Sequence, residues 1–208
     1  MNVFSKKKLF LFDYDGTIAN TSNIHQTAFS YAINNPKIKF KYSEIEGLGT
    51  EEAFRLIFQK NDLALTSAES KKLVSLKRSK ALNLSNQKVE LLPNFLLFIN
   101  EAKTQFQLAI VSSGSLESIL AGLRLNGLTN LFDPIISRED VKISKPSPEG
   151  FNIALKHFPD IDRKDALIFE DSIHGIEAAR HAKIDFVNIK KYDWLYLYKQ
   201  LIKSCYVK

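Results

Sequence analysis

Two aspartates, Asp13 and Asp15, stand two residues apart directly after the apolar segment Leu9–Phe12. Four apolar residues in a row predict a short strand that is buried on both faces. An unpaired carboxylate at the edge of a core costs several kcal/mol, so this strand end needs a cation. Mg²⁺ is the simplest candidate because it binds oxygen ligands. Taken alone, an ordinary Asp-Gly turn after a strand would explain the segment equally well.

The two residues that follow Asp15 also suit a ligand site. Gly16 has no side chain, so that the backbone and a ligand can come close together at this point. Thr17 adds a hydroxyl group at the mouth of the predicted site. Both residues therefore belong to the candidate site, whose other members must come from elsewhere in the chain.

Pairs of polar residues follow two further apolar segments. Leu108–Val111 is followed by Ser112 and Ser113, and Ala166–Phe169 is followed by Glu170 and Asp171. Lys145, next to Pro146, lies between these two pairs along the chain. Ligands of parallel sheets bind beyond the carboxyl ends of the strands, so we expect all of these side chains to meet in one crevice.

The predicted elements support this convergence. Helical periodicity over 22–34, 51–60 and about 66–84, with no convincing strand between 20 and 90, predicts an all-helical block. From Leu92 onward, short apolar strands alternate with helices. The predicted strands are 108–111, 133–137, 166–169 and 186–189, and the predicted helices are 94–105, 116–126, 147–157 and 173–182.

Strands that alternate with helices are typical of an α/β fold. We expect a Rossmann-like, mostly parallel sheet with helices on both faces and right-handed crossovers. The expected catalytic core comprises residues 1–18 and 92–208. It is interrupted by an inserted all-helical cap, residues 19–91, which we expect to determine substrate specificity.

Acids from two strand ends, together with a lysine and a serine hydroxyl, have the chemistry that phosphoryl transfer needs. The acids can hold Mg²⁺, while Lys145 and Ser112 can hold an anion beside it. The chain has no glycine-rich Walker sequence, which argues against an NTPase site. A carboxylate nucleophile that forms an aspartyl-phosphate is then the simplest mechanism. Other roles stay open, since Ser112 can cap the next helix, Lys145 is one of 29 basic residues and Glu170-Asp171 can be a solvated turn.

Four short motifs resemble those of the haloacid dehalogenase-like (HAD) hydrolases. They are Asp13–Thr17, Val111–Gly114, Lys145-Pro146, and Phe169–Ser172 followed by Gly175-Ile176 and Ala178-Ala179. The motifs occur across residues 9–182 in the order and spacing of the family. The similarity is closest to the phosphatase and phosphomutase branch, whose members carry a helical cap after the first motif.

The resemblance implies roles for the residues of these motifs. Asp13 would be the nucleophile that accepts the phosphoryl group. Asp15 would be the general acid/base, a role that is worth about 10²–10⁴-fold in rate. Ser112, Ser113 and Lys145 would bind the phosphoryl oxygens. An Asp two residues after the nucleophile is a mark of phosphatases and mutases, and it argues against dehalogenase chemistry.

The resemblance also implies Mg²⁺ as the cofactor. The metal site would be formed by Asp13 and Asp171, with Glu170 beside it and Asp15 contributing its backbone carbonyl. The substrate would be a small phosphorylated metabolite. This metal site and the phosphate-binding residues together imply a hydrolase of phosphomonoesters.

Thr17 and two residues of the predicted cap are candidates for contact with the substrate. His25 lies where related sugar phosphomutases place a His that assists at the substrate hydroxyl, although a surface His on an amphipathic helix is an equally good explanation. Thr50 belongs to the stretch Gly47–Glu52, which resembles the substrate loop of the family. Mutases usually have an Arg near position 50 that grips a second phosphate, so Thr50 weakens the mutase alternative.

Two smaller departures from the family pattern lie outside the proposed chemistry. Asn20 stands where the family commonly has Asp, at the hinge into the cap. Lys183 stands where the family usually has Gly, directly after Ala182. Of the two, Asn20 could alter closure of the cap.

Composition places limits on compartment and partners. The net charge is +6 and the pI is about 9.2, but the lysines are scattered and form no recognisable nucleic-acid-binding module. No apolar run is long enough for a signal peptide or a membrane span. The single Cys205 excludes an internal disulfide and suits a reducing compartment. We therefore expect a cytoplasmic protein with no nucleic-acid or membrane partner, as a monomer or weak homodimer.

The sequence thus predicts a Mg²⁺-dependent hydrolase of small phosphomonoesters of the sugar phosphate, phosphoglycolate or nucleotide type. It would act through an aspartyl-phosphate intermediate. The first alternative is a sugar phosphomutase similar to β-phosphoglucomutase, which returns the phosphoryl group to the sugar instead of passing it to water. A second alternative is a non-catalytic binding protein on the same fold, which the intact Asp13, Asp15, Lys145 and Asp171 argue against.

Overall fold

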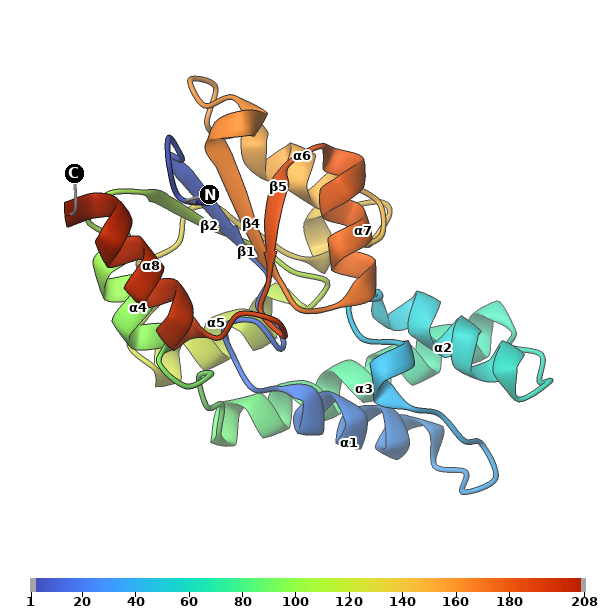
Figure 1. The fold of residues 1–208 in the computed structure, drawn as a ribbon. Coiled ribbons are helices and arrows are strands. Elements are labelled where there is room, and N and C mark those ends of the chain that lie inside the picture. Colours follow the sequence, from blue (N-terminus) through green and yellow to red (C-terminus); the bar gives the residue numbers. More distant parts are fainter. Residues whose placement is uncertain (1–2, 207–208) are drawn as a thin grey trace.

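A parallel sheet of five strands forms the centre of the described chain, residues 3–206 of a computed structural model. The strands are β1 (Leu9–Phe12), β2 (Gln107–Val111), β3 (Ile135–Ile136), β4 (Ala166–Glu170) and β5 (Asp185–Asn188). Their order across the sheet is β3-β2-β1-β4-β5 (Figure 1). The predicted α/β fold with a parallel sheet is confirmed. The side chain of Cys205 lies outside the described ones.

The strand β1 occupies the middle of the sheet and fixes the place of the site. It pairs with β2 on one side and β4 on the other, with Phe12 in register with both Ile110 and Phe169. After β1 the chain therefore builds the sheet outward on one side and then on the other. The carboxyl end of β1 lies at this reversal of strand order, which is where open α/β sheets bind ligands.

Alternate residues of β1 enter two separate apolar cores, as a strand buried on both faces requires. Phe10 and Phe12 join the aromatic core on one face, whereas Leu9 and Leu11 join the smaller core on the other. The first face is covered by α4 (Phe95–Ala102), α5 (Leu116–Leu125) and α8 (Trp194–Tyr206), and the second by α6 (Glu149–Lys156) and α7 (Ile173–Ala182), as Figure 1 shows.

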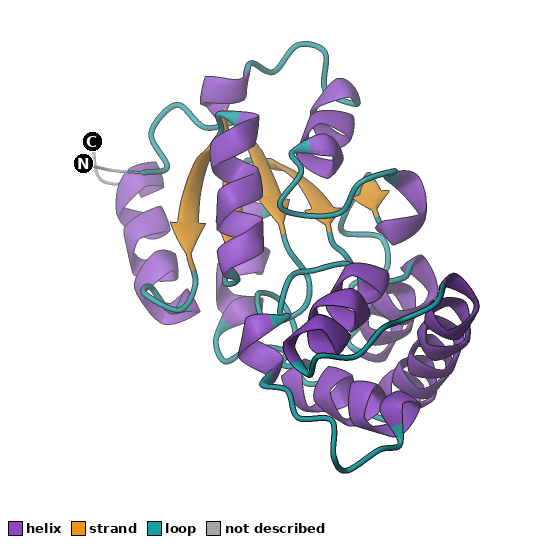
Figure 2. Cartoon of the chain, turned by 90° about the vertical axis from the view of Figure 1, so that its right-hand side faces the viewer, coloured by secondary structure: helices purple, strands orange, loops and turns teal. Residues whose placement is uncertain are grey.

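Three helices form a separate group beyond the carboxyl ends of the strands (Figures 1 and 2). They are α1 (Ser22–Ile33), α2 (Thr50–Lys60) and α3 (Ser67–Gln87), with a short 3-10 turn at Tyr42–Glu44. Residues 20–90 are called the helical unit below. The unit has its own apolar core, which includes Phe29, Phe54 and Ile57.

The two crossings between the sheet and the helical unit lie side by side. The Asn20 amide donates to the Glu90 carbonyl at 2.8 Å, and the Leu92 amide donates to the Ile18 carbonyl at 2.8 Å. These two adjacent stretches of backbone are the covalent links between the sheet and the helical unit. The exact boundaries between the catalytic core and the cap, at 18/19 and 91/92, stay a prediction.

Several predicted boundaries need correction. The helix predicted at 66–84 spans 67–87, the helix predicted at 94–105 ends at 102, and the helix predicted at 147–157 spans 149–156. The strand predicted at 133–137 is reduced to 135–136, and the helix α8 was not predicted. Lys183 has a left-handed φ of 57° at the end of α7, a conformation in which glycine is usual. No helix within residues 3–206 is long and apolar enough to cross a membrane.

Candidate active site

Residues from three strand ends meet at the carboxyl edge of the sheet, as the sequence predicts. Asp13 follows β1, Ser112 follows β2 and Asp171 follows β4, and each is at most 5% exposed. Lys145 reaches this point from the loop before α6. Its ammonium lies 2.6 Å from Asp13 Oδ1 and 2.8 Å from Glu170 Oε1. The two acids and Lys145 thus form one buried cluster of charges.

Lys145 is held as a cation within this cluster. Burial alone would lower its pKa, but the carboxylates of Asp13 and Glu170 raise it above the ordinary value for lysine. Burial raises the pKa of Asp13, and Lys145 opposes that rise. A cation fixed against the predicted nucleophile can neutralise an anion that reacts there.

Glu170 positions Lys145. Its Oε1 accepts from Lys145, and its Oε2 accepts from the Ser172 amide at 2.7 Å and the Ser172 hydroxyl at 3.0 Å. The turn into α7 encloses the carboxylate so tightly that a Cβ on Gly175 would lie 1.8 Å from Oε1. Both oxygens of Glu170 are therefore already used by protein groups.

The predicted metal residues Asp13, Asp15, Glu170 and Asp171 stay a prediction, and the structure shows what each of them can offer a metal. Asp15 was expected to contribute its backbone carbonyl and not its side chain. Among residues 3–206, no three or more Asp, Glu, His or Cys side chains come together as a group that could hold a metal ion. Glu170 is committed to Lys145 and Ser172, and the Asp15 side chain turns away toward the helical unit. The side chains that can still serve a metal are those of Asp13 and Asp171.

The surroundings of Asp171 fit a cation. Thr17 donates its hydroxyl to Oδ1 at 3.2 Å, while Oδ2 is buried and accepts no hydrogen bond. A Cβ on Gly16, where φ is +81°, would lie 2.5 Å from this Oδ2, so only glycine leaves the approach open. Burial, Glu170 and Glu46 raise the pKa of Asp171 to about 7, against the opposing effect of Lys190. Added positive charge would stabilise its ionised form.

Asp15 is bonded to residues of the helical unit. Its Oδ1 accepts from the Thr21 hydroxyl at 2.7 Å and lies 2.8 Å from His25 Nε2. The other ring nitrogen, Nδ1, lies 3.1 Å from the ammonium of Lys77 on α3. His25 and Lys77 are each 7% exposed, which rules out a surface role for His25.

The order of these contacts determines the direction of each hydrogen bond. A lysine ammonium can only donate, so His25 Nδ1 accepts from Lys77 and His25 Nε2–H donates to Asp15. Burial alone would raise the pKa of Asp15, but His25, Thr21 and Lys77 hold it below its ordinary value. Burial lowers the pKa of Lys77 to about 8, although Asp15 opposes this shift.

The predicted phosphate-binding serines have different surroundings. Ser112 lines the cavity beside Asp13, and its hydroxyl accepts from the Gly114 amide at 3.0 Å. It does not cap α5, whose N-terminal cap is Ser115. The hydroxyl of Ser113 donates to the Gly47 carbonyl at 2.8 Å. Ser113 therefore joins the sheet to the helical unit, whereas Ser112 faces the site.

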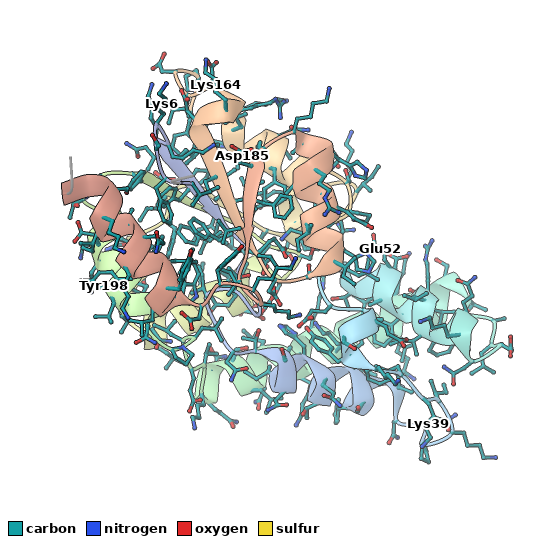
Figure 3. The ribbon with its side chains drawn as sticks, in the orientation of Figure 1. Lys6, Lys39, Glu52, Lys164, Asp185 and Tyr198 are labelled. Atoms are coloured by element: carbon teal, nitrogen blue, oxygen red, sulfur yellow. The ribbon has the colours of Figure 1, made fainter. Side chains whose placement is uncertain are left out.

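A small cavity of about 30 Å³ lies between the sheet and the helical unit. Its lining includes Asp13, Asp15 and Ser112 from the sheet side, and His25, Tyr42, Thr50 and Lys77 from the helical unit. A cavity of this size has room for water but not for a phosphomonoester. Figure 3 shows Glu52 at the boundary where the two parts meet.

Two residues of the site, Thr21 and Lys77, were missed from the sequence. Thr21 precedes α1, and because its hydroxyl bonds Asp15 it makes no cap bond to the helix. Lys77 lies on the buried stripe of α3, together with Ser70, Ala81 and Ser85. A charged residue in phase with the buried positions of an amphipathic helix was the available signal.

The family of haloacid dehalogenase-like hydrolases matches residues 10–189. The chain belongs to this family. Fructose-1-phosphate phosphatase YqaB of Escherichia coli (strain K12) is 25% identical over 181 residues, which cover 86% of this chain and 95% of that protein. Protein CbbY of Cereibacter sphaeroides is 29% identical over 190 residues, which cover 83% of this chain and 79% of that protein. With the family match, these relatives confirm the prediction of a phosphatase-type enzyme.

Solved structures show the same fold. CbbY from Rhodobacter sphaeroides, crystallised with phosphate, superposes with a TM-score of 0.74 at 27% identity, covering 86% of this chain and 84% of the other. The β-phosphoglucomutase of Clostridium difficile superposes with a TM-score of 0.79, covering 95% of this chain and 98% of the other. Its identity of 18% supports the likeness in fold alone.

Proposed function

We propose that this protein is a Mg²⁺-dependent hydrolase of small phosphomonoesters, with Asp13 as the group that accepts the phosphoryl group. The supporting observation is the contact of Lys145 with Asp13, at 2.6 Å and almost without exposure. A buried ammonium beside a carboxylate nucleophile offsets the repulsion between that carboxylate and an incoming phosphate dianion. Ser112, which lines the same cavity, supplies a hydroxyl toward the phosphoryl oxygens.

In the first step an Asp13 oxygen forms a bond to phosphorus while the bond between phosphorus and the ester oxygen breaks. Asp15, protonated, gives its proton to the departing oxygen, which leaves as an alcohol. In the second step water attacks the aspartyl-phosphate, its proton passes to Asp15, and phosphate is released from Asp13. The proton that Asp15 takes from water in one turnover serves the leaving group of the next.

The helical unit controls Asp15 in this scheme. The hydrogen bonds from His25 and Thr21 stabilise its ionised form, which is the form that accepts a proton from water. They also aim the carboxylate into the cavity that it shares with Asp13. The same unit then acts as the predicted cap, since it closes that cavity against bulk water.

Asp13 and Asp171, with the backbone carbonyl of Asp15, are the groups that would hold Mg²⁺. When bound, the metal ion supplies positive charge that stabilises the charge developing on the transferring phosphoryl group. The unbonded Oδ2 of Asp171 and the open approach at Gly16 support this assignment.

Sugar phosphates are the first substrates to test. One relative is named a fructose-1-phosphate phosphatase, and a mutant of CbbY from Rhodobacter sphaeroides was crystallised in complex with xylulose-(1,5)bisphosphate. The lining of the cavity beside Asp13 includes polar groups, among them Asp15, His25 and Thr50, which suit the hydroxyl groups of a sugar. A small phosphorylated sugar is therefore the proposed substrate class.

A sugar phosphomutase is the second candidate. The bonded series Lys77, His25 and Asp15 favours it, because a His held beside the general acid/base can also position a sugar hydroxyl that receives the phosphoryl group. Thr50, which lines the cavity without a positive charge, favours the hydrolase, since a second phosphate has no arginine there. The two candidates differ in whether inorganic phosphate is released.

The test is phosphate release from a panel of sugar phosphates, phosphoglycolate and nucleotides, with Mg²⁺ or EDTA, by wild type and Asp13→Asn. We expect release with Mg²⁺ that EDTA and Asp13→Asn both abolish. Conversion of a sugar phosphate to its isomer without release of phosphate would favour the mutase. Release that persists in Asp13→Asn would rule out Asp13 as the phosphoryl acceptor.

A further inference from the structure

Lys190 joins the proposed metal acid to the helical unit. Its ammonium contacts Oε2 of Glu46 and lies 3.3 Å from Oδ2 of Asp171. Glu46 lies in the loop between the 3-10 turn and α2, which meets the sheet, whereas Lys190 follows β5. The contact thus spans 144 residues of sequence and the boundary between the two parts.

The two carboxylates and the ammonium have very different exposure. The side chains of Asp171 and Glu46 are 1% and 11% exposed, but that of Lys190 is 55% exposed. Lys190 therefore reaches into the site from solvent, and its ammonium touches the one oxygen of Asp171 that accepts no hydrogen bond. At 3.3 Å this contact is longer than the contact of the same ammonium with Glu46.

The backbone around Lys190 is attached to the catalytic strands. The Ile189 amide donates to the Glu170 carbonyl at 2.8 Å, and the Trp194 indole donates to the Thr17 carbonyl at 2.9 Å. The loop is therefore fixed at both ends, while the long side chain of Lys190 can turn between its two acids.

We propose that Lys190 is a positioning residue that couples closure of the helical unit to metal binding at Asp171. This inference rests on the proposed function. With the unit closed, as in this structure, the ammonium lies between Glu46 and Asp171, and Glu46 can hold it when a divalent cation takes its place at Asp171. With the unit open, Glu46 is withdrawn, and Lys190 has Asp171 as its remaining partner. The ammonium then neutralises the acid and competes with the metal for Oδ2.

Charge balance supports this role. Glu170 and Glu46 repel the negative charge of Asp171, and Lys190 is the opposing cation at that carboxylate. Lys145, a buried cation of the same site, is already committed to Asp13 and Glu170. Lys190 would be the counter-ion of Asp171 when no metal is bound, and the metal ion would replace it on binding. The carboxylate of Asp171 would then be paired with a cation in both the metal-free and the metal-bound protein.

The test is a double-mutant cycle on Mg²⁺ affinity, measured by titration calorimetry with wild type, Glu46→Gln, Lys190→Met and the double variant. Loss of Glu46 frees Lys190 to compete at Asp171, so we expect Glu46→Gln to weaken Mg²⁺ binding at least threefold more in wild type than in the Lys190→Met background. In the Lys190→Met background, the effect of Glu46→Gln on Mg²⁺ affinity measures only the Coulombic loss of one negative charge.

Lys191→Met removes a neighbouring charge from the same loop and is the control. In the Lys191→Met background, Glu46→Gln should weaken Mg²⁺ binding by the same factor as in wild type.

The second measurement is amide hydrogen exchange of residues 45–50. Mg²⁺ should slow this exchange in wild type and in Lys191→Met, and the slowing should be lost in Lys190→Met. Equal effects of Glu46→Gln in both backgrounds, or slowing by Mg²⁺ that survives in Lys190→Met, would overturn the coupling. Failure of wild type to bind Mg²⁺ at all would instead contradict the proposed function, so the two failures are distinguishable.

Discussion

The carboxyl group of Asp15 is controlled by residues of the helical unit. Thr21 and His25 bond its Oδ1, and Lys77 fixes the tautomer of His25 from the far side of the ring. Each of these residues is buried, and all three belong to the segment between the two crossings. Asp15, the proposed general acid/base, is therefore fully positioned only when the helical unit is closed.

The protonation of Lys77 gives the first prediction. Its pKa is lowered to about 8, so it is charged below that pH and loses its proton as the pH rises through that value. A neutral amine can accept from His25 Nδ1–H, which removes Nε2–H from Asp15. We expect kcat/KM to fall above a pH of about 8.

Two variants of Lys77 check the assignment. Lys77→Arg keeps its charge to far higher pH and should move the alkaline decline upward by more than one pH unit. Lys77→Met should be slow at every pH and lack that decline. A decline near pH 8 that is unchanged in Lys77→Met would assign it to another group.

The loop between the 3-10 turn and α2 is the element that brings the helical unit onto the sheet. The Gly47 carbonyl accepts from the Ser113 hydroxyl, and the backbone at Gly47 has a φ of +82°. A Cβ at this position would lie 2.3 Å from the Ser172 hydroxyl oxygen, beside the turn that holds Glu170. The loop can approach the sheet this closely only because it carries glycine.

Substitution of this glycine gives the second prediction. Gly47→Ala adds a left-handed backbone penalty of about 1–2 kcal/mol and a steric contact with Ser172, and the contact acts only on the closed state. We expect kcat/KM to fall about tenfold or more, measured by steady-state kinetics. Gly127→Ala is the control, because φ there is +69° but no atom lies within 4 Å. It should reduce stability slightly and leave kcat/KM unchanged, and equal losses in both variants would contradict the closure role.

The elements that the sequence predicts best are those with one dominant physical signal. The strand over 9–12 was located to the residue because four apolar residues end at a charge, and the motifs placed Asp13, Lys145 and Asp171 in one crevice. The helix α8 was missed although its buried residues Trp194, Leu197 and Leu201 follow helical spacing, so the signal was present in the sequence.

The hydrogen-bond partners of the site residues were harder to predict than the places of these residues in the fold. Glu170 and Asp171 are adjacent in sequence, yet Glu170 bonds Lys145 and Ser172 while Asp171 bonds Thr17. Successive residues of a strand point to opposite faces, so two adjacent carboxylates meet different neighbouring loops. Which loop bonds which carboxylate depends on three-dimensional packing, and no local pattern of residues contains that information.

At the scale of the whole molecule, the first strand and the last helix meet behind the site. The aromatic core joins β1 to α4 and α8, with Trp194 packed against Phe95, Phe98 and Phe169. The indole of Trp194 donates to the Thr17 carbonyl across 177 residues of sequence. The helix α8 therefore supports the loop that carries Asp13 and Asp15. Lys6, Lys164 and Asp185 mark the amino-terminal edge of the sheet, which lies away from this loop (Figure 3).

Loss of this hydrogen bond gives the third prediction. Trp194→Phe removes the indole donor and part of a fully buried side chain, so we expect the free energy of unfolding to fall by about 1–3 kcal/mol. Chemical denaturation measures that change. Tyr196→Phe, on the exposed side of α8, is the control and should change stability by less than about 0.5 kcal/mol. Equal stability of Trp194→Phe and wild type would show that the bond does not support the loop.

In the proposed mechanism Asp13 carries the phosphoryl group between substrate and water. The most direct measurement is a single turnover with the phosphomonoester that the panel ranks first, labelled in its phosphoryl group and quenched in acid within milliseconds. We expect one label per chain on the peptide that contains Asp13, appearing before free phosphate and absent in Asp13→Asn. Free phosphate that appears with no labelled protein at any time, or label on another residue, would contradict the claim.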